Sequence, residues 1–165
     1  MPKTLLSMNP FETSCQILLQ QLETWEPRLL ALPEEIISER KNSQNRSIRQ
    51  ILGHLVDSAS NNLHRIVHLQ YRENPMSFPN YATEGNNDRW IAIQDYQHED
   101  WPDLVQLWKY ANLHLVHVIR RVDQTKLDNQ WQSSETRLIS LRENIEYYPQ
   151  HFELHLKEME ELIKS

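Results

Sequence analysis

The chain contains only two glycines, Gly53 and Gly85, among its 165 residues. Dinucleotide-binding folds, P-loop folds and β-sandwiches with tight turns need more glycine, because their turns use backbone conformations that other residues avoid. Leucine, glutamate and glutamine, which all favour helices, are abundant instead. The scarcity of glycine therefore favours an all-α fold.

Apolar residues recur at steps of three and four in four separate stretches, as expected for helices that bury one face. These stretches lie within residues 9–33, 47–71, 100–122 and 137–163. Four amphipathic helices of this length predict a four-helix bundle, and we expect residues 1–165 to form a single domain. Residues expected to face the core include Cys15, Leu22, Leu52, Leu55, Trp108, Leu115, Ile145 and Phe152.

Residues at the ends of these stretches predict where the helices begin. Asn9 is the expected N-cap of the first helix, with Pro10 at its first position, and Asp100 is the expected N-cap of the third. Pro27 is expected to kink or end the first helix. The last helix is expected to begin near Arg137.

A long connection separates the second helix from the third. It spans about 26 residues with Pro75, Pro79 and the polar run Glu84–Asp88, and the residues around Trp90 suggest a short helical piece. This crossover would let the second and third helices run parallel, which gives an up-down-down-up order. The second and fourth helices are then antiparallel. Before the fourth helix, Trp131–Thr136 predicts a short extended segment.

Charge and composition exclude several classes of protein. The net charge is −6 and no basic cluster stands out, which argues against a nucleic-acid partner. Cys15 is the single cysteine, so neither an intrachain disulfide nor a cysteine-based zinc site is expected. The N-terminus lacks a signal-peptide pattern and no apolar run is long enough to span a membrane, so we expect a cytoplasmic protein. Exposed apolar side chains would favour a homodimer, but no motif specifies one.

His151 and His155 stand four residues apart in the last predicted helix. This spacing puts both imidazoles on one face, with their Cβ atoms roughly 5–6 Å apart. The pair could grip one metal ion or could be polar residues beside the core. Glu153 lies about 200° around the helix from His151 and cannot serve as the base of a zinc-protease motif. Pro149 predicts a kink that helps to aim His151.

His54 is the candidate third ligand. It lies with Ser58, Asn61 and Arg65 on a polar strip of the second helix. His54 is about 10 Å past the start of that helix and His155 is about 12 Å before the end of the fourth, so antiparallel packing puts them at nearly one height. Three imidazoles leave coordination positions open, as in catalytic rather than structural sites. We expect these histidines to lie outside the site: His64, His68, His98, His114 and His117.

Four residues near the candidate site have alternative interpretations. Asp57 could orient a histidine, but a solvated carboxylate is favoured. Asn61 could face the site or solvent. Trp90 and Tyr96 could line a pocket, although covering the core is favoured for both.

The chain resembles the DinB/YfiT-like family of four-helix proteins over most of its length. The resemblance rests on ILGHLVDS at Ile51–Ser58, on the pair Asp100–Trp101, and on the Tyr-Tyr-x-x-His-x-x-x-His run at Tyr147–His155. It implies an up-down-down-up bundle, in agreement with the helical pattern.

The resemblance also implies that His54, His151 and His155 hold one divalent metal ion, such as zinc, nickel or another first-row metal. Members of the family with a known activity include metal-dependent transferases that use small thiols such as bacillithiol or mycothiol. We therefore expect a metal-dependent enzyme that activates a thiol or water, either an S-transferase or a related hydrolase, acting on a small molecule. The alternative is a non-catalytic bundle that binds a metal, a small ligand or a protein partner. No general acid or base is identified.

Overall fold

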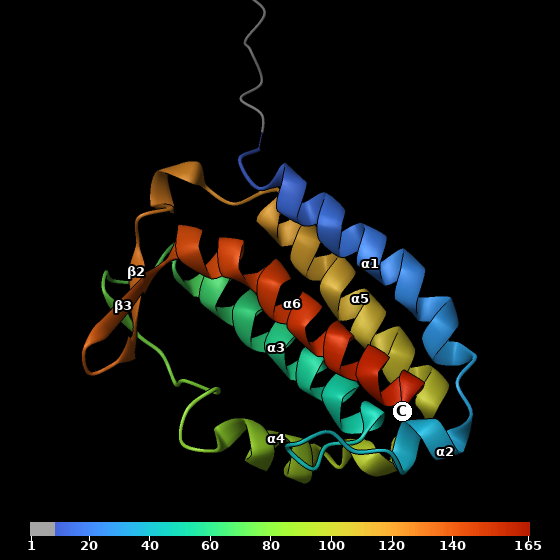
Figure 1. The fold of residues 1–165 in the computed structure, drawn as a ribbon. Helices are drawn as coiled ribbons and strands as arrows, with labels where there is room; N and C mark the ends of the chain where they lie inside the picture. Colours follow the sequence, from blue (N-terminus) through green and yellow to red (C-terminus); the bar gives the residue numbers. More distant parts are fainter. Residues whose placement is uncertain (1–8) are drawn as a thin grey trace, which may run out of the picture.

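A computed structural model describes residues 9–165, and its main body is a bundle of four long helices (Figure 1). The bundle consists of α1 (Glu12–Leu30), α3 (Ile48–His68), α5 (Trp101–Ile119) and α6 (Leu141–Lys164). Helices α1 and α6 run in one direction, and α3 and α5 run in the other (Figure 1). Each of α3 and α1 packs against both α5 and α6. The predicted up-down-down-up bundle is confirmed.

Side-chain caps define the starts of the three later bundle helices. Ser47 caps α3 and Ser140 caps α6, and in each case the residue three positions later returns a bond to the serine backbone N–H. Asp100 accepts a hydrogen bond from the backbone N–H of Asp103, which confirms the predicted cap of α5. These caps satisfy N–H groups that a helix leaves unpaired in its first turn.

The predicted start of α1 is wrong. The helix begins at Glu12, and Asn9 instead accepts a hydrogen bond from the N–H of Phe11 at 2.9 Å, in a turn that precedes the helix. Pro27 does not end the helix, which continues to Leu30. The predicted kink at Pro27 stays a prediction.

A small three-stranded sheet lies at one end of the bundle (Figure 1). Its strands are β1 (Met76–Ser77), β2 (Gln130–Ser134) and β3 (Arg137–Ser140), with β1 parallel to β2 and β3 antiparallel to it. The extended segment within residues 131–136 is confirmed by β2. The start of the last helix at Arg137 is wrong, because residues 137–140 pair with β2 and the serine cap delays the helix to Leu141.

The crossover between α3 and α5 contains α4 (Asn86–Gln94) and a 3₁₀ turn at Tyr96–His98. Both pack against α3, and the predicted short helical piece is confirmed. Two further short helices were not predicted, namely α2 (Glu34–Ser38) and a 3₁₀ turn at Gln124–Lys126. Helix α2 also packs on α3, so α3 is covered by elements from both sides of the sequence.

The core lies between the four long helices. Trp108 of α5 and Phe152 of α6 stack with their ring centroids 5.8 Å apart, and both are fully buried. Cys15 is also fully buried, as predicted for a small apolar side chain. Fully buried predicted core residues also include Leu52, Leu55, Leu115 and Ile145. No described helix combines the length and apolar character needed to cross a bilayer.

Gly53 allows the crossover to approach α3 closely. A Cβ atom at this position would lie 2.2 Å from the ring of Tyr96. Tyr96 is buried, and its hydroxyl donates a hydrogen bond to Asp57 at 2.6 Å, so its ring is held in place. The missing side chain of Gly53 is therefore a packing requirement.

Gly53→Ala should destabilise the protein. Alanine improves helix propensity by about 1 kcal/mol, but overpacking against Tyr96 costs about 1–3 kcal/mol or more. We expect a net loss of roughly 1–2 kcal/mol in the free energy of unfolding, measured by denaturant titration. Ser60→Ala, on the exposed face of the same helix, is the control and should change stability by less than about 0.5 kcal/mol. Equal stability of both variants would contradict the close contact.

Candidate metal centre

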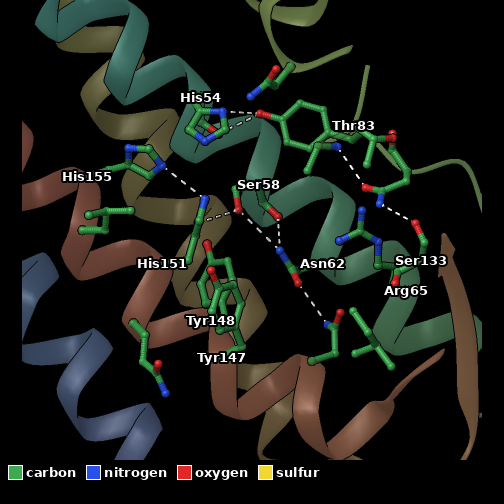
Figure 2. A pocket seen from close by; sticks show the side chains of 18 of the residues that line it. His54, Ser58, Asn62, Arg65, Thr83, Ser133, Tyr147, Tyr148, His151 and His155 are labelled. Carbon is green, nitrogen blue, oxygen red and sulfur yellow. Dashed lines mark hydrogen bonds between the residues drawn. The ribbon is translucent and has the colours of Figure 1, made fainter. Parts of the chain in front are cut away.

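Three histidines converge where α3 faces α6. His54 comes from α3, and His151 and His155 come from α6 (Figure 2). One ring nitrogen from each histidine lies within 4.8 Å of the others, and the cluster could hold a metal ion. The ring centroid of His54 lies 5.4 Å from that of His151 and 4.5 Å from that of His155. The structure thus brings the three predicted residues together at one height.

Helix α6 places His151 and His155 on adjacent turns of one face. The two Nε2 atoms lie 3.1 Å apart. Two nitrogens that each bind zinc at about 2.0–2.1 Å lie roughly 3 Å apart, so this spacing suits a shared ion. The helix runs without interruption through Pro149, which is buried two residues before His151. The predicted kink at Pro149 stays a prediction.

The other ring nitrogen of each histidine has a partner in the protein. Nδ1 of His155 lies 2.9 Å from a carboxylate oxygen of Glu158, and Nδ1 of His151 lies 3.3 Å from Oγ of Ser58. Nδ1 of His54 forms a short hydrogen bond with the hydroxyl of Tyr81. Such partners fix the orientation of metal-binding imidazoles and the position of their proton.

These contacts favour the tautomer that metal binding requires. Glu158 can only accept, since its hydrogen bond with His155 lowers its carboxyl pKa and keeps it ionised. In the tautomer with the proton on Nδ1, His54 donates to the hydroxyl of Tyr81, whose own proton can point to the carbonyl oxygen of His54 at 3.4 Å. Protons on the Nδ1 atoms leave the Nε2 lone pairs directed into the cluster.

Burial keeps two of the imidazoles neutral. It lowers the pKa of His54 to about 2, with a further contribution from the charges that His155 and His151 would carry. Burial and the neighbouring His155 lower the pKa of His151 to about 4. Because a metal ion binds only unprotonated imidazole, these rings are ready to act as ligands at neutral pH.

Amide side chains extend the hydrogen-bond network behind His151. Asn144 of α6 donates to Asn62 at 3.0 Å, and Asn62 donates to Oγ of Ser58 at 3.4 Å (Figure 2). The chain of bonds links α6 to α3 and then reaches His151 through Ser58. It therefore holds the ring from the side opposite to its Nε2 atom.

A cavity of about 840 Å³ opens beside the three histidines. Its walls come from α3 and the residues just before it, α6, the crossover and the strands β2 and β3. Ser58, Asn62 and Arg65 of α3 face it (Figure 2). The volume lies within the range of pockets that bind small molecules, about 300–1,000 Å³.

Comparisons with known proteins identify the family of this chain. The family model described as the DinB superfamily matches residues 17–159. The chain belongs to the DinB superfamily. No protein with curated annotation shows significant similarity to this DinB chain.

Solved structures of other proteins share the fold, and two of them are similar to this chain over most of its length. One is YfiT from Bacillus subtilis, described as a probable metal-dependent hydrolase with an unusual four-helix bundle topology. Its TM-score is 0.81 at 17% sequence identity, and the match covers 99% of this DinB chain and 91% of YfiT. The other is the mycothiol-dependent maleylpyruvate isomerase, with a TM-score of 0.73 at 12% identity, over 91% of this chain and 60% of the isomerase.

Asp57 does not take either role that the sequence suggested. The favoured interpretation as a solvated carboxylate is wrong, because the side chain is 1% exposed. It does not orient a histidine either, since Oδ1 accepts hydrogen bonds from Tyr96 at 2.6 Å and Gln94 at 2.5 Å. Asp57 instead attaches the crossover to α3. Burial raises its carboxyl pKa to about 6, although these two bonds oppose the rise.

The other residues that the sequence placed near the site contact partners outside the histidine cluster. Asn61 is buried and donates to the carbonyl oxygen of Asp57 in its own helix, so it faces neither the cavity nor solvent. Tyr96 covers α3, as predicted, and Trp90 packs edge-on against Tyr81.

Glu153 is exposed, and its carboxylate pairs with Lys157. The histidines that were predicted to lie elsewhere are outside the cluster, namely His64, His68, His98, His114 and His117.

Sequence reasoning missed two residues that support the cluster. Tyr81 lies in the irregular crossover, 27 positions from His54, where no periodic pattern predicts a contact. Glu158 follows His155 by three positions on one helix face, and this spacing could have identified it.

Asp57→Asn should change how stability depends on pH. The folded pKa of about 6 exceeds the unfolded value of about 3.9, so the contribution of Asp57 is complete below about pH 4 and declines as pH rises through about 6. Asparagine keeps the Oδ1 acceptor but does not titrate. The free energy of unfolding of the variant, relative to the parent, should therefore rise by roughly 2 kcal/mol between about pH 4 and pH 7.

Denaturant titrations at several pH values measure this difference. Asp128→Asn, at an exposed position, is the control and should give a curve parallel to that of the parent. A parallel curve for Asp57→Asn would show that Asp57 has the same pKa in the folded and unfolded states.

Proposed function

We propose that this DinB protein is a metal-dependent enzyme in which His54, His151 and His155 hold one divalent ion. The observation that carries the proposal is the convergence of three ring nitrogens within 4.8 Å at the wall of a cavity of about 840 Å³. The residues fit an ion, because the imidazoles of His54 and His151 are neutral and the Nδ1 atoms already have partners. Two Nε2 atoms 3.1 Å apart also suit a shared cation.

The chemistry follows from the number of ligands. Three protein nitrogens leave one to three coordination positions for other molecules. A bound divalent ion lowers the pKa of a coordinated thiol or water and so supplies a nucleophile at neutral pH. Glu158, Ser58 and Tyr81 hold the three rings in position through their Nδ1 atoms. Because these three side chains are hydrogen-bonded to the imidazole rings, we assign none of them as a general base.

The cavity supports a small-molecule substrate. In an S-transferase reaction, the thiol sulfur forms a bond to an electrophilic carbon, the leaving group departs with its electron pair, and the thiol proton passes to solvent. In a hydrolase reaction, water replaces the thiol. The likeness to YfiT, a probable metal-dependent hydrolase, supports the hydrolase reaction, and the likeness to a mycothiol-dependent isomerase supports the use of a small thiol. The alternative is a non-catalytic bundle that binds a metal, a small ligand or a protein partner.

His155→Ala should remove the bound metal. Protein purified without a histidine tag from metal-replete cells should contain close to one equivalent of a divalent ion, measured by elemental analysis. The variant loses one of three ligands and should contain little. His114→Ala, at an exposed position outside the cluster, is the control and should keep its metal. A metal-free parent protein would refute the metal site.

Catalysis needs a separate measurement. The metal-loaded protein is tested with small thiols and electrophiles, and with hydrolysable esters and amides, beside the His155→Ala and His114→Ala variants. Turnover by the parent and by His114→Ala, but not by His155→Ala, would support the proposal that the protein is an enzyme. Full metal content with no turnover across varied thiols and metals would favour the binding protein.

Glu158→Gln should weaken metal binding. The ionised carboxylate accepts the Nδ1 proton of His155, which orients the ring and makes Nε2 a better donor. We expect the dissociation constant for zinc, measured by competition with a chromophoric chelator, to rise about 10–100-fold. Glu153→Gln alters an exposed carboxylate of the same helix and should leave the constant unchanged. Equal constants for the two variants would rule out this role of Glu158.

A further inference from the structure

Arg65 lies in the same cavity as the histidine cluster but is not used by the proposed metal site. It follows His54 by 11 residues on α3, which brings it within about 20° of the same helix face. Ser58 and Asn62 stand between them on that face, and all four side chains line the cavity (Figure 2). The polar face of α3 thus continues from the metal ligands to a cationic side chain.

Two of the three nitrogens of the Arg65 guanidinium are buried without an acceptor. The residue is 7% exposed, and neither Nε nor Nη2 has a hydrogen-bond partner among the described residues. Burial lowers its pKa to about 10, so it stays protonated at neutral pH. Arg46, a second buried arginine of the cavity wall, forms an ion pair with Asp88, whereas Arg65 makes no ion pair within residues 9–165. A buried charge of this kind is costly unless something else pairs with it.

Aromatic residues fix the position of this guanidinium. Its central carbon lies 4.3 Å from the ring centroid of Trp131 and 5.9 Å from that of Phe78. Contact with the indole leaves the edge of the planar group for hydrogen bonding. Nε and Nη2 together form the edge that a carboxylate binds with two parallel hydrogen bonds.

We propose that Arg65 binds the carboxylate of a small molecule that reacts at the histidine cluster. The proposal rests on the proposed function and names the class of its substrate, a carboxylate-bearing thiol or electrophile. A carboxylate is favoured over a phosphate because a single unpaired positive charge balances a single negative charge. Nε and Nη2 are shielded from solvent in this conformation, so the carboxylate reaches them through a small shift of the surrounding side chains.

Arg65 and the histidines line one cavity, and Arg65 stands roughly 10 Å along the α3 axis beyond Ser58, which contacts His151. Side chains on α3 also lean toward the start of the helix, so Arg65 reaches back toward Ser58 and His151. A ligand with an extended chain of several carbons can therefore join a reacting group at the histidines to a carboxylate at Arg65.

NMR of the arginine side chain tests the contact directly. The zinc-loaded, ¹⁵N-labelled protein is titrated with ω-mercaptoalkanoates of increasing chain length, and with the matching carboxamides and phosphonates. The Nε–H signal of Arg65 is identified by its loss in Arg65→Lys. At least one carboxylate should shift this signal, and its carboxamide should bind about 10–100-fold more weakly, as expected for loss of hydrogen bonds to a charged group.

Two variants separate this role from a structural one. Arg65→Met keeps an unbranched side chain against Trp131 and should bind the carboxylate and the carboxamide equally. Its midpoint of thermal unfolding should stay the same or rise, because a buried unpaired charge is removed. Arg137→Met alters an exposed arginine of the same cavity wall and should keep the preference for the carboxylate.

The outcomes distinguish this inference from the metal site. An unmoved Arg65 signal in protein that holds zinc would overturn the carboxylate site and leave the metal centre intact. So would tighter binding of the phosphonate, or a preference for the carboxylate that survives in Arg65→Met. If the protein holds no zinc, the same titration is made on the metal-free chain. A shifted signal there would support the carboxylate site while the proposed function fails.

Discussion

The antiparallel packing of α3 against α6 is the contact on which the candidate site depends, because it sets the height of His54 against His151 and His155. Both helices begin at a serine whose cap is completed three residues later. A start displaced by one residue would move every following side chain by about 1.5 Å along the axis and about 100° around it. The two caps therefore contribute to the geometry of the site as well as to helix stability.

The crossover completes this arrangement from outside the bundle. Tyr96 lies against Gly53 and bonds to Asp57, while Tyr81 bonds to the ring and the carbonyl oxygen of His54. These contacts bracket the first turns of α3 around the candidate ligand. The crossover makes two helices parallel, and it also packs against the candidate metal centre through Tyr81.

Periodicity and spacing predicted the parts of the molecule that depend on local sequence. The four amphipathic stripes predicted the bundle. The positions of the histidines along their helices, together with the family resemblance, predicted that His54 lies beside His151 and His155. The errors arose where tertiary contacts decide. Residues 137–140 are extended because they pair with β2, a partner that a helical pattern cannot reveal. Asp57 is buried because Tyr96 and Gln94 fold back over it from the crossover, and the same loop supplies Tyr81.

The polar face of α3 is difficult to explain by stability alone. On a covered helix face, apolar residues contribute more to the stability of the fold than buried histidine, serine and arginine do. Along most of this face each polar group has a partner: His54 has Tyr81, Ser58 has His151 and Asn62, and Asn144 closes the chain. Arg65 breaks the pattern, since Nε and Nη2 lack an acceptor in the described part of the protein. Next to Arg65, Nε1 of Trp131 is also buried without a partner in the described part of the protein. These unpaired donors mark the position at which a ligand, rather than the protein, is expected to complete the network.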